Sequence, residues 1–125
     1  MTPKFIDHIV IMVKDIQETE KFYSTFLDKP EYMNEAYLIY KIGATRVFFK
    51  LVNGEWQLTD KDRGGLNHFA FGVSTGDELK GFAKILDDGG IKNSGIRIDK
   101  DGNKEYIWLD DPNGIRVEIY RSGNE

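Results

Sequence analysis

The chain contains no cysteine, so disulfide bonds, thiolate metal sites and cysteine nucleophiles are all excluded. Any metal must therefore be held by nitrogen and oxygen ligands. Long apolar runs are also missing, because the longest, Ile9–Val13, is far shorter than the roughly 20 residues that a membrane-spanning helix needs. Only three prolines occur, and no polar tract interrupts the chain. We expect a packed domain with no membrane partner.

No charge of one sign dominates the sequence. The 17 basic and 21 acidic residues are mixed along the chain and give a formal charge of −4, which argues against nucleic acid as a partner. Residues 1–20 lack the basic, apolar and small-residue order of an export signal, so we expect a cytoplasmic protein. A length of 125 residues with 40% hydrophobic side chains fits one domain, spanning residues 1–125.

The two halves of the chain repeat each other at an offset of 60 residues. Type and spacing agree at the matched positions. The matches are His8 with His68, Val13 with Val73, Glu18 with Glu78, Phe22 with Phe82, and Phe26 with Leu86. Self-similarity of this kind predicts two tandem modules, about residues 4–54 and 64–121, within the single domain.

Each half starts with the pattern of a strand followed by a helix. The β-rich runs, which we expect to form buried strands, are Phe5–Val13 and Leu66–Val73. Capping-box pairs mark the helix starts: Asp15 with Glu18, and Thr75 with Glu78. Apolar residues then follow at helical spacing: Ile16, Phe22, Phe26 and Leu27 in the first half, and Leu79, Phe82, Ile85 and Leu86 in the second. Gly89-Gly90 is expected to end the second helix.

After each helix the hydrophobic pattern returns to a period of two, which is typical of strands. The predicted strands are Glu31–Asn34, Tyr37–Ile42 and Arg46–Val52, then Ile96–Ile98, Glu105–Leu109 and Ile115–Tyr120. Turn residues separate them: Gly43-Ala44, Asp101-Gly102-Asn103 and Asp111-Pro112-Asn113-Gly114. Residues 53–65 link the halves, and the tail from Arg121 is expected to fray. The order predicts an α+β fold of two β-α-β-β-β modules.

The only two histidines occupy equivalent positions of the repeat. On strand parity, His8 shares a face with Ile6, Val10 and Met12. A single histidine in an apolar strand is more typical of a hydrogen-bonded core residue than of a ligand. Equivalent residues of a pseudo-twofold repeat can meet near its axis, however, so the pair together favours a shared metal.

The last predicted strand supplies a third candidate ligand. Arg116, Glu118 and Tyr120 point to one face of it, and Glu118 alone would be interpreted as solvent-facing. Two neutral imidazoles and one carboxylate leave coordination positions open, as in catalytic rather than structural metal sites.

Three segments carry a resemblance to a known family: D-H-I-V-I-M-V, L-N-H-F-A-F-G-V and W-L-D-D-P-N-G-I-R-V-E-I-Y. Together they resemble the vicinal oxygen chelate superfamily, which includes glyoxalase I, fosfomycin-resistance proteins, methylmalonyl-CoA epimerases, extradiol dioxygenases and bleomycin-binding proteins. The resemblance implies a cupped mixed sheet with helices outside, usually in a homodimer. It also implies one divalent metal bound by His8, His68 and Glu118, with Glu118 as the catalytic residue.

The sequence departs from the patterns of individual family members. Glyoxalase I commonly has a fourth ligand, a glutamate, on the strand equivalent to Arg46–Val52, where an offset of 70 places Phe48 opposite Glu118. Fosfomycin transferases have a threonine where this chain has Val10, and Arg121 is not clearly their phosphonate-binding arginine. Extradiol dioxygenases are about twice as long. The reaction and the choice among Mn, Fe, Ni, Zn and Co therefore stay open.

Three aromatic residues, Phe48, Tyr106 and Trp108, could line a substrate pocket or simply pack. The leading hypothesis is an enzyme whose metal binds two neighbouring oxygens of a small substrate; its reaction could be that of a lyase, isomerase, thiol transferase or dioxygenase. The alternative is a bleomycin-resistance-like protein that sequesters an antibiotic without chemistry. A third hypothesis is a dimeric scaffold with structural histidines. The turn at residues 111–114 is given no chemical role.

Overall fold

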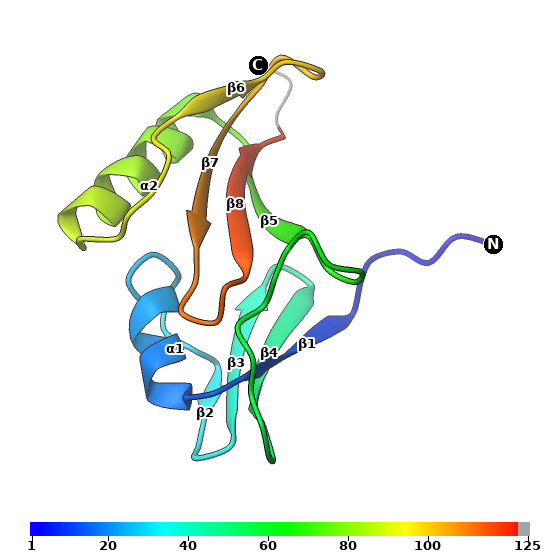
Figure 1. Cartoon of the computed structure of the whole chain (residues 1–125). Helices are drawn as coiled ribbons and strands as arrows, with labels where there is room; N and C mark the ends of the chain where they lie inside the picture. The colour runs from blue at the N-terminus through cyan, green and yellow to red at the C-terminus, as the bar shows by residue number, and fades with distance from the viewer. Residues whose placement is uncertain (123–125) are drawn as a thin grey trace. The chain divides into compact units, whose positions relative to one another are not determined.

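The computed structural model describes residues 1–122 and divides the chain into two compact units, Met1–Gln57 and the residues from Leu58 onward (Figure 1). Each unit holds one helix and one four-stranded mixed sheet, so the predicted α+β class is confirmed. Among the described residues, no helix is both long and apolar enough to cross a membrane.

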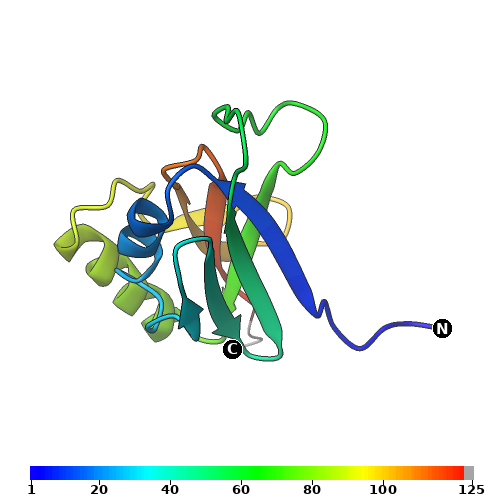
Figure 2. The ribbon, with the colours of Figure 1, turned by 90° about the horizontal axis from the view of Figure 1, so that it is seen from below.

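The first unit follows the β-α-β-β-β order. Its elements are β1 (His8–Val13), α1 (Ile16–Tyr23), β2 (Tyr32–Met33), β3 (Tyr37–Ile42) and β4 (Thr45–Leu51). The strand order in the sheet is β1-β4-β3-β2, with β1 parallel to β4 and the other neighbours antiparallel. Helix α1 packs on the β3–β4 side of this sheet, as Figure 2 shows.

The second unit repeats this order and topology. Its elements are β5 (His68–Val73), α2 (Gly76–Asp88), β6 (Arg97–Asp99), β7 (Lys104–Asp110) and β8 (Arg116–Arg121). The strand order is β5-β8-β7-β6, again with one parallel pair, β5 with β8. Helix α2 contacts β7 and β8. Arg121 is the last residue of β8, and of the tail that was expected to fray, residues 123–125 lie outside the described part.

Both helices begin where the capping pattern predicts. The Asp15 carboxylate accepts a hydrogen bond from the Glu18 backbone N–H. Thr75 and Glu78 form the complete reciprocal capping box, which satisfies N–H groups that the first helical turn leaves free. Helix α2 ends at Asp88, followed by Gly89 as its cap and by Gly90 at a φ of +72°.

The helix faces differ from the predicted ones in the first unit. Ile16 and Phe26 are buried as predicted, and Phe22 and Leu27 are only partly buried. Thr19 and Tyr23, which the sequence pattern did not select, take the remaining buried positions. Thr19 can be buried because its hydroxyl donates to the Asp15 carbonyl oxygen at 2.7 Å. In the second unit Leu79 and Leu86 are buried as predicted, whereas Ile85 is exposed.

Strands β1 and β5 were predicted to be buried, but each lies at the edge of its sheet. Ile11 and Val13 are buried against the helix side, while Val10 and Met12 are 50% and 46% exposed. The continuous apolar run of β1 therefore does not mean burial on both faces. In each unit the helix covers one face of the sheet. The histidine, His8 or His68, lies on the opposite face, which we call the uncovered face because the helix of that unit does not pack on it.

Candidate metal centre

The two histidines begin equivalent strands with the same register. His8 is the Cα partner of Arg46 in the β1–β4 pair, and His68 is the Cα partner of Arg116 in the β5–β8 pair. Two residues further along, Val10 lies opposite Phe48 and Ala70 lies opposite Glu118. Since strand side chains alternate between faces, Glu118 shares a face with His68 as a diagonal neighbour.

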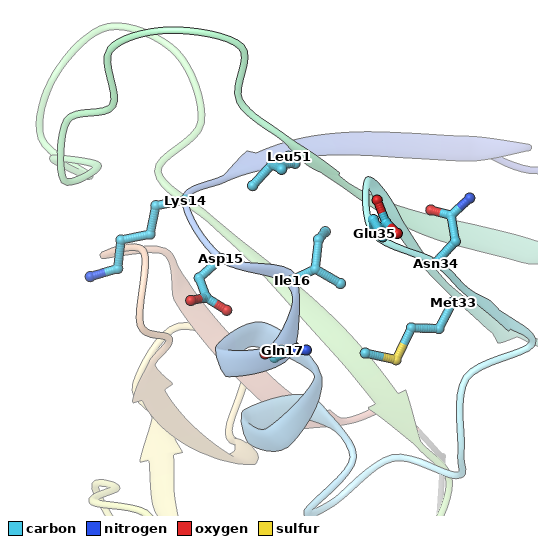
Figure 3. Close-up of a pocket in the computed structure, with 8 residues that line it drawn as sticks. All are labelled: Lys14, Asp15, Ile16, Gln17, Met33, Asn34, Glu35 and Leu51. Atoms are coloured by element: carbon cyan, nitrogen blue, oxygen red, sulfur yellow. The ribbon is translucent and has the colours of Figure 1, made fainter.

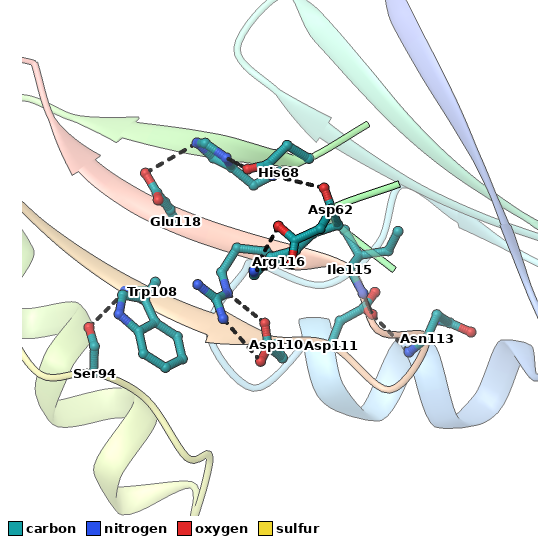
Figure 4. A network of polar contacts seen from close by, with 12 residues as sticks. Asp62, His68, Ser94, Trp108, Asp110, Asp111, Asn113, Ile115, Arg116 and Glu118 are labelled. Atoms are coloured by element: carbon teal, nitrogen blue, oxygen red, sulfur yellow. Dashed lines mark hydrogen bonds and ion pairs between the residues drawn. The ribbon is translucent and has the colours of Figure 1, made fainter. Parts of the chain in front are cut away.

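Figure 4 shows His68 and Glu118 turned toward each other. The His68 Nε2 atom lies 3.6 Å from the Glu118 Oε1 atom, and the side chains are 41% and 17% exposed. Two ligands that each bind one ion at about 2 Å lie about 3.3 Å apart at a tetrahedral angle. The observed separation is close to that value, so this nitrogen and oxygen pair fits a divalent ion.

The Nδ1 atoms of both histidines are already occupied. His68 Nδ1 lies 2.7 Å from the Asn67 Oδ1 atom, and His8 Nδ1 lies 2.8 Å from the Asp7 Oδ1 atom. Metal-binding histidines almost always use the second ring nitrogen in this way, which fixes the ring and directs the first nitrogen to the metal. Both histidines therefore present Nε2 as the available ligand atom.

His8 has a different neighbour from His68. Its ring lies 5.5 Å from the Phe48 ring, at the position where the second unit has Glu118. His8 belongs to the first unit, whereas His68 and Glu118 belong to the second. Among residues 1–122, no three histidine, aspartate or glutamate side chains gather into a group suited to a metal ion. The structure thus brings two of the three predicted ligands together, and convergence with His8 stays a prediction.

Arg116 contacts Trp108 and Asp110 beside Glu118, and the sequence did not predict these contacts. We call these three residues the Arg116 cluster. The Arg116 guanidinium carbon lies 3.9 Å from the centre of the Trp108 ring, and its Nε donates to the Asp110 Oδ1 atom at 2.6 Å (Figure 4). Arg116 and Asp110 are Cα partners in the β7–β8 register, which the sequence pairing alone did not supply. The stacked and bonded guanidinium fixes one wall of the face that carries Glu118.

Tyrosines extend the same face beyond Glu118. Tyr106 stacks on Tyr120 with ring centres 5.8 Å apart, and both side chains are half-buried. The Tyr120 hydroxyl donates to the Asp99 Oδ2 atom at 2.8 Å, which lowers the pKa of Asp99 and raises the pKa of Tyr120. Trp108 is the Cα partner of Glu118, so Tyr106 and Trp108 both border the candidate metal centre.

Two cavities, one in each unit, lie apart from the His68–Glu118 pair. A cavity of about 580 Å³ in the first unit lies between the start of α1 and the β2–β3 turn, bordered by Lys14, Met33 and Glu35 (Figure 3). A second cavity of about 550 Å³ lies between residues 58–62 and the β7–β8 turn, with Arg116 on its wall. Of these two cavities, the second adjoins the Arg116 cluster.

The chain matches a family model over residues 5–119, described as the Glyoxalase/Bleomycin resistance protein/Dioxygenase superfamily. It therefore belongs to that superfamily. No match was found among curated proteins.

Several solved structures share the fold. A glyoxalase family protein from Enterococcus faecalis has 24% sequence identity and a TM-score of 0.76, covering 94% of this chain and 98% of that one. A glyoxylase/bleomycin resistance protein/dioxygenase domain from Frankia sp. EAN1pec has 18% identity and a TM-score of 0.81, covering 98% and 100%. A lactoylglutathione lyase from Agrobacterium tumefaciens has 16% identity and a TM-score of 0.74, covering 98% and 96%. At these identities the similarity shows the fold alone.

Proposed function

We propose that this protein is a metal-dependent enzyme acting on a small substrate that presents two neighbouring oxygens to the metal. The observation that carries the proposal is the His68–Glu118 pair, 3.6 Å apart on the uncovered face of the second sheet. His8 is the proposed third ligand. A divalent ion bound by these residues would supply Lewis acidity that polarises a carbonyl or stabilises an oxyanion.

The chain's own residues have distinct proposed roles. His68 holds its side of the site through Nε2, while Glu118 holds the other side and is the proposed acceptor of a substrate proton. Glu118 is 17% exposed, which leaves a carboxylate oxygen within reach of a small molecule. Tyr106 and Trp108 limit water access and orient the substrate beside Glu118. Phe48 lies next to His8, at the position of the first unit that is equivalent to Glu118. A cytoplasmic homodimer is part of the same proposal.

The decisive test is metal affinity, measured by calorimetric titration of metal-free protein with Mn, Fe, Ni, Zn and Co. We expect His68→Ala and Glu118→Gln each to weaken binding at least about 100-fold, because each removes a ligand from an open site. Equal affinity in the wild type and both variants would overturn the proposal. His8→Ala tests convergence: a loss of the same size supports a three-ligand site, and unchanged affinity removes His8 from it.

The matched control is Glu105→Gln. Glu105 is a carboxylate of β7, and its Oε1 atom accepts a hydrogen bond from Arg121 Nη1 at 2.8 Å. Because it is adjacent to Tyr106 in the strand, its side chain points to the opposite face of the sheet. This variant makes the same chemical change away from the candidate metal centre. Its metal affinity should equal that of the wild type.

The aromatic side chains favour one second candidate, the sequestration of an aromatic or peptide-like antibiotic. Stacked Tyr106 and Tyr120, with Trp108 beside them, form a surface on which planar groups can stack. Unchanged antibiotic recovered after tight binding to metal-free protein would support this candidate. Substrate turnover that returns when metal is added would exclude it.

A further inference from the structure

Asn67, the residue before His68, makes two hydrogen bonds through its side-chain amide. Its Nδ2 donates to the Lys61 carbonyl oxygen at 2.8 Å, and its Oδ1 lies 2.7 Å from His68 Nδ1. A carbonyl oxygen only accepts, and an amide nitrogen only donates. The Lys61 carbonyl therefore decides which end of the Asn67 amide faces the histidine.

This orientation determines the proton position on the imidazole. Because Asn67 Oδ1 can only accept, the bond requires a proton on His68 Nδ1. In a neutral imidazole the other nitrogen, Nε2, is then left with a lone pair. Nε2 is also the atom that lies 3.6 Å from Glu118 Oε1. The tautomer selected by Asn67 is thus the one that can bind a metal beside Glu118.

We infer that Asn67 is a positioning residue that holds His68 in its Nδ1–H tautomer, with Nε2 directed toward Glu118. The inference deepens the proposed function, on which it rests for the identity of the ligand bound at Nε2. Asn67 itself does not touch the metal. It acts through the ring that it orients, as outer-shell partners of metal-binding histidines do.

The segment that carries the Lys61 carbonyl is anchored to the turn between β7 and β8 two residues earlier, at Thr59. The Thr59 N–H donates to the Asn113 carbonyl oxygen at 2.9 Å. Next to it, Gly114 has a φ of +81°, and an added Cβ there would lie 2.6 Å from the Thr59 carbonyl oxygen. Leu58 and Thr59 thereby lie directly against the turn. The Asp111–Gly114 turn, for which the sequence suggested no chemical role, supports the segment that orients Asn67.

The first unit reaches the same tautomer by another route. Asp7 takes the place of Asn67, and a carboxylate that accepts at His8 Nδ1 leaves Nε2 without a proton when the imidazole is neutral. The Asp7 side chain is 81% exposed. Aspartate at position 67 cannot donate to the Lys61 carbonyl, but both of its oxygens accept, so it should preserve the tautomer, whereas alanine should not.

The test reads the tautomer directly in metal-free, ¹⁵N-labelled protein at about pH 8, where an ordinary imidazole is neutral. We expect long-range ¹H–¹⁵N correlation spectra to show His68 of the wild type as the Nδ1–H form. Asn67→Ala should convert it to a mixture or to the Nε2–H form, and Asn67→Asp should keep Nδ1–H. Lys61→Ala is the matched control, because it keeps the carbonyl that Asn67 uses and should leave the spectrum unchanged.

Zn²⁺ or Mn²⁺ titrations provide the second readout. Asn67→Ala should weaken binding about 10–100-fold, and Asn67→Asp should stay within about 10-fold of the wild type. An unchanged His68 tautomer in Asn67→Ala would overturn the inference. If that variant does not fold, loss of the Nδ1–H form in Asn67→Asp would overturn it instead. Absent metal binding in the wild type with the expected tautomers would contradict the proposed function and leave the positioning role standing.

Discussion

The two units have the same topology and the same strand register, but they differ in what fills the core. In the first unit the core contains an aromatic cluster among aliphatic side chains: the Tyr23 and Phe49 rings lie 4.6 Å apart, and Tyr40 and Phe26 complete the cluster. In the second unit the core side chains are aliphatic. They include Leu79, Leu86, Ile107, Leu109, Val117 and Ile119. One backbone arrangement therefore accepts two kinds of packing.

The uncovered faces of the two sheets also differ: the first is apolar beside its histidine, and the second is charged. Beside its histidine the first unit has the apolar Phe48, whereas the second has the carboxylate Glu118 with Arg116 and Trp108 next to it. The repeated register fixes where a side chain points, and the residue at that position decides what it can do. Comparing the units shows that the adjacent nitrogen and oxygen donors, His68 and Glu118, both belong to the second.

The largest expected effect is on the aromatic core of the first unit. Tyr23→Ala should lower the free energy of unfolding by about 3–5 kcal/mol, because Tyr23 is fully buried and its removal leaves a cavity beside Phe49. Urea unfolding followed by circular dichroism measures the change. Tyr32→Ala is the control: Tyr32 is 51% exposed, so the change should stay within about 0.5 kcal/mol. Equal effects would contradict the assignment of the core.

Phe48→Glu would make the uncovered face of the first unit resemble that of the second. A carboxylate at this position lies beside His8 and corresponds to the fourth ligand of glyoxalase I, so metal affinity should rise at least about 10-fold, or 1.4 kcal/mol. Calorimetric titration with Zn²⁺ or Ni²⁺ measures it. Phe48→Gln separates charge and ligation from the loss of the ring, and similar affinities for both variants would refute the expectation.

Tyr40 gives the smallest effect, at a core position where the second unit has the buried Leu109 of β7, which cannot ionise. The Tyr40 hydroxyl lies 2.7 Å from Ser24 Oγ, and burial raises the pKa of Tyr40 to about 12. Tyr40→Phe should cost about 1 kcal/mol at neutral pH.

The sign of the pH dependence follows from the raised pKa. The folded state keeps the neutral phenol while the unfolded chain ionises near pH 10, so the stability contributed by Tyr40 is complete below pH 10 and is lost as the pH rises toward 12. Unfolding free energies measured between pH 9 and 12 should fall more steeply for the wild type than for Tyr40→Phe. Parallel curves would show that Tyr40 does not titrate as its burial requires.

Much of the fold could be predicted from the sequence because the signals repeat. The 60-residue offset, the caps at Asp15 and Thr75, and the alternating strands located nearly every element. Edge positions for β1 and β5 were not predictable from composition, since an apolar run looks the same at the centre and at the edge of a sheet. Tyr23 was passed over because Phe22 beside it is equally apolar, and only the phase of the helix separates them.

The candidate site was partly predictable for the same reason. Strand parity selected the face of Glu118, and the repeat selected the histidines. The Arg116–Trp108 stack depends on the register between β7 and β8, which turn geometry and packing determine together. Asn67 carried no signal, since its role depends on a backbone carbonyl that becomes its partner only after the chain folds.

Gly114 has a consequence for how the second unit could be altered. A single methyl group placed there would press on the Thr59 carbonyl oxygen, in a segment that no substrate need touch. The disturbance would pass along residues 59–61 to Asn67 and so to an imidazole proton. Variation at Gly114 or in residues 59–61 could therefore change the tautomer of His68, the proposed metal ligand, while every residue that lines the proposed site stays the same.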